Sequence, residues 1–316
     1  MDLHIAFSSD NNYVAHLGVA IISLLENNRN FDMVNIHVLD NGISDENKNK
    51  LKEIVFSRAN IFFYELSSLL SKLGEKYKIP KTISISSYAR LFISEILDQN
   101  ITKIIYADSD ALFMQSLDKI WSLDLSHFSI AGVLDHVGVE NKKKIGIQED
   151  SLYINAGFLL INLEKWRSIK AHKKMITFIE SKKGNVIHHD QGVINACFED
   201  DILILLPHYN VMTSFFDFRD VESIKHYYGI ANYYSQNDIN EAKRNPVFVH
   251  FTPSFSKRPW IEGSKHPLKG IYKEYLLKTP FKNNGLQKDK RPFKILFLEK
   301  MFWIFGPKFY KSMMNV

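Results

Sequence analysis

The chain has 316 residues, of which 45% are hydrophobic and 24% are charged, a composition that excludes a largely disordered protein. The net charge of +5 is small for this length, and lysines are mixed with acids until the final third, so charge does not indicate a nucleic-acid partner. A single cysteine, Cys197, excludes an internal disulfide framework, and neither a secretory signal nor a membrane-spanning apolar run is present. We therefore expect a cytoplasmic protein.

Strand-like and helix-like segments alternate at the start of the chain. The expected strands are Leu3–Ser9, Val34–Leu39 and Ile61–Leu66, and the expected helices are Tyr13–Glu26 and Ser44–Arg58, with Ser44 as the N-cap of the second. This alternation predicts an α/β fold with a mostly parallel sheet flanked by helices.

The later elements are less regular. A helix is expected over Ser87–Ile96, strands up to Asp108, over Ser129–Leu134 and over Phe158–Asn162, a helix over Ala171–Ser181, and a short helix after His189. Residues 209–244 are rich in Tyr, Phe, Asn and Asp, so we expect little regular structure there before a short strand over Pro246–Phe251. Residues 282–291 are the predicted boundary between a catalytic domain (1–281) and a linker with a tail (282–316).

The most informative motif is Asp108-Ser109-Asp110, which follows an apolar run starting at Lys103. In extended backbone, residues i and i+2 project to the same side, so the two carboxylates could hold one hard cation. Ligands of such sheets bind beyond the carboxyl ends of the strands. Taken alone, however, an Asp-x-Asp is more often a pair of acids in a solvated turn.

A divalent ion could neutralise the charge of a bound pyrophosphate in this chain. The sequence contains neither a Gly-x-Gly-x-x-Gly fingerprint after its first strand nor a P-loop, so a pyrophosphate would need another source of neutralising charge. His250 ends an apolar run and is a candidate third ligand, although a lone His on a strand is more often a core residue. The cations Lys257 and Arg258 follow it closely.

A further polar cluster follows the first strand. Asp10, Asn12 and Tyr13 could read a base and a ribose by hydrogen bonding and stacking, and an Asx-type turn with a helix N-cap explains them about equally well. Residues 76–87 and the loop after His250 carry small or proline-punctuated polar sequence, and we expect them to close over a bound ligand.

Six stretches now stand in one order along the chain. They are Asp10-Asn11-Asn12-Tyr13, Ser87-Tyr88-Ala89-Arg90-Leu91, Tyr106-Ala107-Asp108-Ser109-Asp110, Tyr153 to Leu163 with Asn155-Ala156-Gly157, His189-Asp190-Gln191-Gly192, and His250 to Trp260. This set resembles the motifs of family 8 glycosyltransferases, the retaining enzymes that include bacterial lipopolysaccharide galactosyl- and glucosyltransferases. The resemblance implies a GT-A fold, Mn²⁺ (or Mg²⁺), a UDP-galactose or UDP-glucose donor, and an oligosaccharide or lipid-linked saccharide acceptor.

The resemblance also implies site residues. The metal would be held by Asp108, Asp110 and His250; the donor would be bound by Asp10, Asn12, Tyr13, Arg90, Asp108, Ser109, Asn155, Ala156, and Lys257 or Arg258; and the catalytic residues would be Asp190 and Gln191. The sequence departs from the family after the histidine. Pro253 and Ser256 stand where a Gly and a Lys are usual, and Lys257-Arg258 lies one residue late, so the residue that contacts the diphosphate stays open between these two.

The presence of a glutamine at position 191 favours one mechanism for retaining the configuration at the anomeric carbon of the transferred sugar. A double displacement needs a carboxylate beside the anomeric carbon, and glutamine is a poor nucleophile. We therefore expect attack by the acceptor on the face that UDP leaves, with Gln191 stabilising the oxocarbenium-like state and Asp190 holding sugar hydroxyls. The alternative for both residues is an ordinary pair at a helix N-terminus.

Two other functions fit an apolar strand followed by Asp-x-Asp. The first is a haloacid dehalogenase-type phosphatase with Asp108 as nucleophile, but Leu112 stands where that class has Thr or Val, and Asp200-Asp201 precedes an apolar run instead of following one. The second is a non-catalytic sugar-nucleotide sensor that keeps the metal site. The products distinguish the three functions. A phosphatase would release free phosphate, a transferase would form UDP and a glycoside, and a sensor would form neither.

The tail from Lys288 to Val316 interleaves lysines with aromatic and aliphatic residues. This pattern predicts a peripheral helix on the anionic inner face of the cytoplasmic membrane. The alternative is a C-terminal helix packed on the catalytic domain or on a second subunit.

Overall fold

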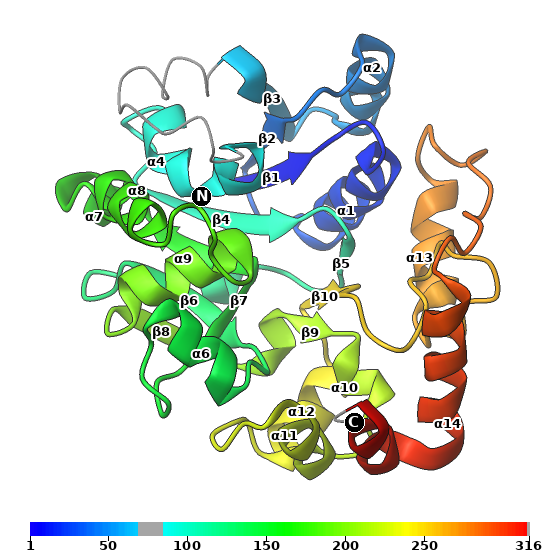
Figure 1. Ribbon diagram of the computed structural model, residues 1–316. Helices are drawn as coiled ribbons and strands as arrows, with labels where there is room; N and C mark the ends of the chain where they lie inside the picture. Colours follow the sequence, from blue (N-terminus) through cyan, green and yellow to red (C-terminus); the bar gives the residue numbers. More distant parts are fainter. Residues whose placement is uncertain (69–84, 315–316) are drawn as a thin grey trace.

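The computed structural model describes residues 1–68 and 85–314, and a seven-stranded sheet lies at its centre (Figure 1). The strands are β1 (Asp2–Ser9), β2 (Met33–Asp40), β3 (Ala59–Glu65), β4 (Lys103–Asp108), β6 (Ile130–Leu134), β7 (Ile154–Asn162) and β8 (Ile202–Leu205), in the order β3-β2-β1-β4-β7-β6-β8. Only β7 pairs antiparallel, with β4 and β6. The beginning of β7 therefore lies at the same edge as the end of β4.

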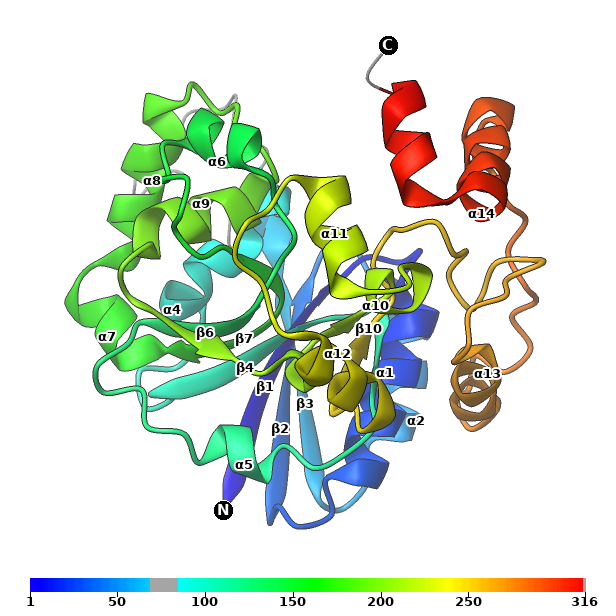
Figure 2. The same cartoon turned by 90° about the horizontal axis from the view of Figure 1, so that it is seen from below.

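Helices cover both faces of this sheet (Figure 2). One face packs on α1 (Val14–Asn27) and α2 (Asp45–Ile54), and the other packs on η1 (Ile85–Phe92), α4 (Ile93–Ile96), α7 (Leu163–Ser168), α8 (Ala171–Ser181) and α9 (His189–Phe198). Two further short helices, α5 (Asp118–Trp121) and α6 (Val139–Ile145), follow β5 (Ala111–Phe113) and β6, respectively. The predicted α/β layering is confirmed.

The first five elements match their predictions closely. Ser44 caps α2 by accepting a hydrogen bond from the backbone N–H of Asn47. The helix ends at Ile54, four residues before the predicted Arg58, because Val55 has extended backbone. The predicted helix over Ser87–Ile96 is instead a 3₁₀ segment followed by one turn of α-helix. Of the segment expected to close over a ligand, residues 76–84 lie outside the described part of the chain.

The prediction for residues 209–244 was wrong. After η2 (Pro207–Tyr209), this region forms β9 (Val211–Met212), α10 (Ser214–Asp217), α11 (Val221–Tyr228) and α12 (Gln236–Arg244). The sequence contains recognisable helix caps in this region: Asp220 caps α11, and Ser235 forms a capping box with Asp238 at α12. Aromatic residues interrupt the spacing of apolar and polar positions in α10 and α11, and α12 has only two buried side chains, Ile239 and Ala242, so the helical periodicity is weak.

A second, three-stranded sheet has the order β5-β10-β9. It is formed by β5 (Ala111–Phe113), β10 (Phe248–His250) and β9. Antiparallel pairing sets His250 opposite Ala111, and the backbone N–H of Phe251 donates to the carbonyl of Asp110. This register brings the end of β10 to the loop that joins β4 to β5.

The C-terminal segment lies against the part of the chain that contains the two sheets. After α13 (Lys269–Leu277), the backbone of Gln287 pairs with Trp260 and Glu262, and α14 (Phe293–Met314) follows, with a kink at Gly306. Leu298 and Phe302 of α14 are buried, and the ring of Phe302 stacks on Phe255 with centroids 3.5 Å apart. Within the described residues, no helix combines the length and apolarity needed to cross a bilayer. The division into two domains at residue 281 stays a prediction.

Burial of His266 predicts a loss of stability in acid. Its Nδ1 accepts a hydrogen bond from the N–H of Leu268, and burial lowers its pKa from 6.5 to about 4. Between these values the unfolded chain binds the extra proton, so stability falls as the pH drops from 6.5 to about 4, by up to about 3 kcal/mol. Urea unfolding at pH 7 and pH 4.5 should show a smaller decrease for His266→Gln than for wild type. The exposed control His127→Gln should keep the wild-type decrease; equal pH dependence in all three proteins would contradict the assignment.

Candidate functional site

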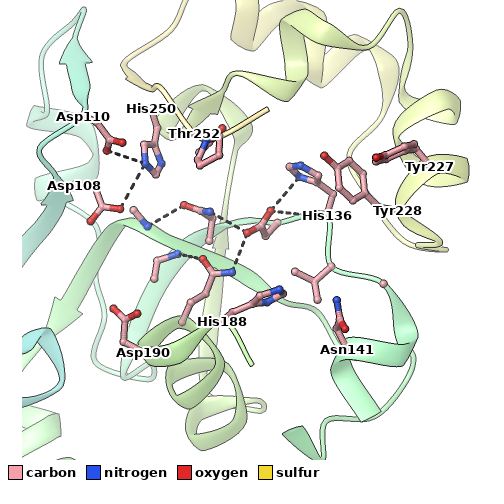
Figure 3. A pocket seen from close by; sticks show the side chains of 18 of the residues that line it. Asp108, Asp110, His136, Asn141, His188, Asp190, Tyr227, Tyr228, His250 and Thr252 are labelled. Atoms are coloured by element: carbon pink, nitrogen blue, oxygen red, sulfur yellow. Dashed lines mark hydrogen bonds and ion pairs between the residues drawn. The ribbon is translucent and has the colours of Figure 1, made fainter. Parts of the chain in front are cut away.

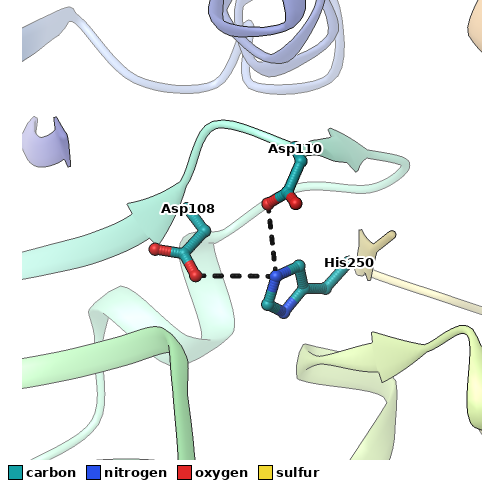
Figure 4. Close-up of side chains that lie close together, drawn as sticks. All are labelled: Asp108, Asp110 and His250. Carbon is teal, nitrogen blue, oxygen red and sulfur yellow. Dashed lines mark ion pairs between the residues drawn. The ribbon is translucent and has the colours of Figure 1, made fainter. Parts of the chain in front are cut away.

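Asp108, Asp110 and His250 converge at the junction of the two sheets (Figure 4). Asp108 ends β4, Asp110 precedes β5, and His250 ends β10. The Nε2 atom of His250 lies 3.5 Å from Asp108 Oδ2 and 3.3 Å from Asp110 Oδ1, and one ligand atom from each residue lies within 4.8 Å of the others. The three predicted metal ligands are therefore brought together.

The electrostatics of the cluster suit a cation. Burial by itself lowers the pKa of His250, but Asp110 and Asp108 raise it above its ordinary value. Burial raises the pKa of Asp110, and contact with His250 and Arg258 more than offsets this, so that the net shift is downward. Carboxylate oxygens suit Mn²⁺ and Mg²⁺, and an imidazole nitrogen beside them suits a transition-metal ion, so this donor set fits a divalent cation such as Mn²⁺.

Gly157 makes room for the histidine. A Cβ atom at this position of β7 would lie 2.2 Å from His250 Cε1 and 2.4 Å from its Nδ1. Gly157→Ala is therefore expected to displace the imidazole and to weaken Mn²⁺ binding about 10–100-fold. Electron paramagnetic resonance titration of free Mn²⁺ measures this. The control is Gly270→Ala, where a Cβ meets nothing within 4 Å; unchanged Mn²⁺ affinity in Gly157→Ala would show that His250 does not bind the ion.

Arg90 connects the acids to the neighbouring strand. Its guanidinium donates to Asp108 at 3.0 Å and to the carbonyl of Ala156 at 2.6 Å, and it forms an ion pair with Asp190. Burial would lower the pKa of Arg90, but Asp108 and Asp190 raise it, so the guanidinium stays charged. It also lies 4.2 Å above the ring of Tyr106. These contacts place one fixed positive charge beside the acidic pair.

Gln191 and Asn155 share a partner that the sequence did not reveal as a site residue, Asp135. Asp135 Oδ2 accepts hydrogen bonds from Asn155 at 2.9 Å and from Gln191 at 3.0 Å, and Gln191 Oε1 accepts one from the N–H of Ala156. Burial raises the pKa of Asp135, but His136 and the hydrogen bond from Asn155 hold it well below its ordinary value. Asp135 directly follows a predicted apolar strand, as Asp108 does, and that signal could have found it.

These residues line one cavity of about 810 Å³ (Figure 3). The predicted residues in its wall are Arg90, Asp108, Asp110, Asn155, Ala156, Asp190, Gln191, His250 and Arg258. The cluster of Asp108, Asp110 and His250, called the metal-ligand cluster below because these residues could hold a metal ion, lies at one end of the cavity. Tyr227 and Tyr228 lie at the other end (Figure 3). The cavity therefore has charged side chains at one end and aromatic side chains at the other.

A smaller cavity of about 260 Å³ adjoins it at the two acids. Asp10, Tyr13 and Ser109 line it together with Asp108 and Asp110. Asp10 accepts hydrogen bonds from the N–H groups of Asn12 and Tyr13, which is the predicted Asx-type turn. Asn12 itself lies in the wall of neither cavity.

Arg258 and Lys257 point in different directions. Arg258 donates to Asp110 at 3.1 Å and to the hydroxyl of Tyr13 at 3.3 Å, so it reaches the acidic cluster. Lys257 instead forms an ion pair with Asp289 at 3.0 Å and is absent from the wall of the 810 Å³ cavity. The structure thus separates the two cations that the sequence left as alternatives.

Comparison with known proteins assigns this arrangement to a family. Residues 4–263 match the model of Glycosyl transferase family 8. The chain belongs to glycosyl transferase family 8. General stress protein A of Bacillus subtilis (strain 168) is 30% identical over 287 residues, which cover 90% of this chain and 96% of that protein. The lipopolysaccharide 1,2-glucosyltransferase of Escherichia coli (strain K12) is 23% identical, over 90% of this chain and 80% of that enzyme.

Solved structures of the family have the same fold. The crystal structure of galactosyltransferase LgtC, in complex with donor and acceptor sugar analogues, is similar with a TM-score of 0.69 and 25% identity, covering 89% of this chain and 96% of that one. The predicted family and GT-A fold are confirmed. As a family 8 member the chain is a glycosyltransferase, with homologues that act in lipopolysaccharide synthesis.

Proposed function

We propose that this protein is a retaining, metal-dependent hexosyltransferase. It moves galactose or glucose from a UDP-sugar to an oligosaccharide or lipid-linked saccharide during synthesis of lipopolysaccharide, lipooligosaccharide or another cell-surface glycan. The observation that carries the proposal is the Asp108, Asp110 and His250 cluster at one end of a cavity that also contains Arg90, Asp190 and Gln191. Charge at one end and hydrogen-bonding groups beyond it suit a sugar diphosphate.

In this proposal Asp108, Asp110 and His250 hold Mn²⁺ (or Mg²⁺). When bound, such an ion neutralises charge on the diphosphate oxygens. The Arg258 guanidinium would also neutralise charge on the diphosphate, because it is the cation that reaches Asp110. Lys257 would have to leave Asp289 to take part. Asp10, Tyr13 and Ser109 line the adjoining cavity, which supports their assignment to the nucleoside. Asn12 is exposed and next to Tyr13 in the chain, and its contact with the nucleoside is part of the proposal.

The reaction proceeds by substitution on one face. The bond from the anomeric carbon to the UDP oxygen breaks, the acceptor oxygen bonds to the same carbon from the same side, and its proton leaves with the diphosphate. Gln191 stabilises positive charge on the ring through its amide oxygen, and Asp190 holds sugar hydroxyls. Asp190 is anchored by Arg90, although burial raises its pKa above the ordinary value. Asn155 and Ala156 complete the wall that faces the donor.

The test is turnover with defined donors. Purified protein is incubated with Mn²⁺ and a panel of UDP-sugars, and UDP release is measured with and without lipooligosaccharide. UDP release with one hexose donor, increased by acceptor, is the expected result. Free phosphate would instead indicate a phosphatase using Asp108, and binding without product would indicate a sensor. Family membership favours transfer over both.

We also propose that α14 docks on the inner face of the cytoplasmic membrane. One side of this helix packs on the domain through Leu298 and Phe302. Exposed apolar side chains among the described residues of α14 include Phe293, Phe297, Trp303, Ile304 and Phe305. Lysines lie among them in the sequence, and each cation near an anionic surface contributes about 1 kcal/mol. Exposed aromatic and basic groups on one helix support an interfacial position.

Removing two exposed aromatic side chains should weaken membrane binding without unfolding the protein. Phe297→Ser with Trp303→Ser is expected to reduce sedimentation with anionic vesicles at least about tenfold, because each side chain loses about 1.5–3 kcal/mol of burial in lipid. The control is Phe56→Ser with Leu152→Ser, two equally exposed positions outside α14. If full-length protein ignores anionic vesicles at low salt, α14 is a structural element only.

A further inference from the structure

The catalytic cavity continues toward the C-terminal helix. A third cavity of about 310 Å³ shares three wall residues with it, namely Tyr227, Tyr228 and Pro253. The far wall of this third cavity is formed by the C-terminal segment, through Arg291, Ile295 and Glu299. Ile295 and Glu299 are four residues apart in α14 and so lie on one side of the helix, and Arg291, which precedes the helix, reaches Glu299 at 2.7 Å. A path of adjoining cavities therefore leads from the metal-ligand cluster to the beginning of α14.

The groups around this third cavity match the chemistry of a sugar. Tyr227 and Tyr228 present two rings with centroids 4.8 Å apart and planes at 84°. Aromatic rings and the aliphatic chain of Ile295 pack on the C–H faces of a pyranose, and an ion pair offers charged donors and acceptors to its hydroxyls. Such a pair is present, since Arg291 lies 2.7 Å from Glu299. Apolar walls with a few convergent polar groups are typical of ligand sites.

The walls are also held in place. A Cβ at Gly138 would lie 2.3 Å from the carbonyl oxygen of Tyr228, so the loop after β6 and the end of α11 are in direct backbone contact. On the other side, Asp289 accepts hydrogen bonds from Arg291, and the stack of Phe302 on Phe255 fixes α14 against the loop after β10. A subsite built from fixed groups loses little entropy on binding.

We infer that this third cavity is an acceptor subsite that binds a second sugar unit, one removed from the unit that receives the hexose. The inference rests on the proposed function and extends it, because it makes the C-terminal helix part of the acceptor site. The acceptor is then a saccharide of at least two units, which enters past Ile295 and reaches the cluster at Asp108 across Tyr227 and Tyr228.

The experiment blocks the subsite and compares acceptors by length. Ile295→Trp fills the cavity, and the matched control Ile304→Trp changes an isoleucine of the same helix that is 69% exposed and lies outside the cavity. Methyl glycosides of galactose and glucose and their β-linked di- and trisaccharides are titrated onto the full-length proteins in Mn²⁺ and UDP. Saturation-transfer NMR reports binding without turnover, and UDP release from the donor is measured separately.

Wild type should bind one series of di- and trisaccharides at least about tenfold more tightly than the monosaccharide. Ile295→Trp should remove this difference and leave monosaccharide binding unchanged, whereas Ile304→Trp should behave as wild type. Equal affinity of wild type for all lengths, or equal effects of the two substitutions, would overturn the subsite. Failure of the proposed function has a different signature, namely no UDP release by wild type from any donor, whatever the binding data show.

Discussion

Replacing Asp108 or Asp110 by asparagine is expected to reduce hexose transfer by at least about a thousandfold. Each substitution removes one carboxylate charge from a cluster whose ligand atoms lie within 4.8 Å of one another. Neither substitution opens a cavity in the core, because asparagine has the same shape. Initial rates of UDP release at saturating Mn²⁺ measure the loss, and thermal unfolding verifies that the fold is kept.

Asp124→Asn is the matched control for these two variants. Asp124 is an exposed acid that lies outside the catalytic cavity, so its replacement should leave the rate unchanged. Turnover at the wild-type rate in either Asp108→Asn or Asp110→Asn would remove the metal assignment. A loss of rate with a lowered unfolding temperature would instead indicate that the acids are needed for the fold, through the hydrogen bonds that Asp108 and Asp110 accept from Arg90 and Arg258.

Gln191→Ala is expected to lower kcat by about a hundredfold while the KM for the donor changes little. A group that acts on the charge of the transition state affects the rate more than the binding of the ground state. In the structure the Gln191 amide bridges the N–H of Ala156 and the carboxylate of Asp135, so it is oriented before substrate arrives. Steady-state kinetics with the donor varied separates kcat from KM.

Gln115→Ala provides the comparison. The Gln115 amide is part-buried and donates to the carbonyl of Pro246, away from the cavity, so its loss should affect stability alone. If Gln191→Ala raises only the donor KM, Gln191 positions the sugar and does not stabilise charge. A covalent sugar trapped on any carboxylate would replace same-face substitution by a double displacement.

The sequence predicted those parts of the fold in which local patterns are strong. β1, α1, β2 and β3 agree with their predictions to within a few residues, because each apolar run is bounded by polar or capping residues. The direction of β7 could not be predicted, since a buried strand has the same apolar pattern whether it runs parallel or antiparallel. Antiparallel pairing with β4 depends on contacts between residues far apart in the sequence, such as Ile105 with Leu160.

The site residues, like the fold, could be predicted where a local sequence pattern marks them. Asp108, Asp110 and His250 each end or follow an apolar run, so their common place at a sheet edge could be expected. The different directions of Lys257 and Arg258 depend on Asp289, more than thirty residues later in the sequence. No local pattern encodes such a contact.

The position of His250 in the second sheet has a consequence for the order in which the protein matures. Asp108 and His250 are 142 residues apart (250 − 108), so at a translation rate of about 5–20 residues per second the ribosome adds the histidine roughly 7–28 seconds after the first acid. During that interval β1 to β4 can pair, while β5 still lacks its partner β10. A nascent chain therefore carries the two acids before the imidazole, and the proposed three-ligand metal site is complete only after β10 has emerged.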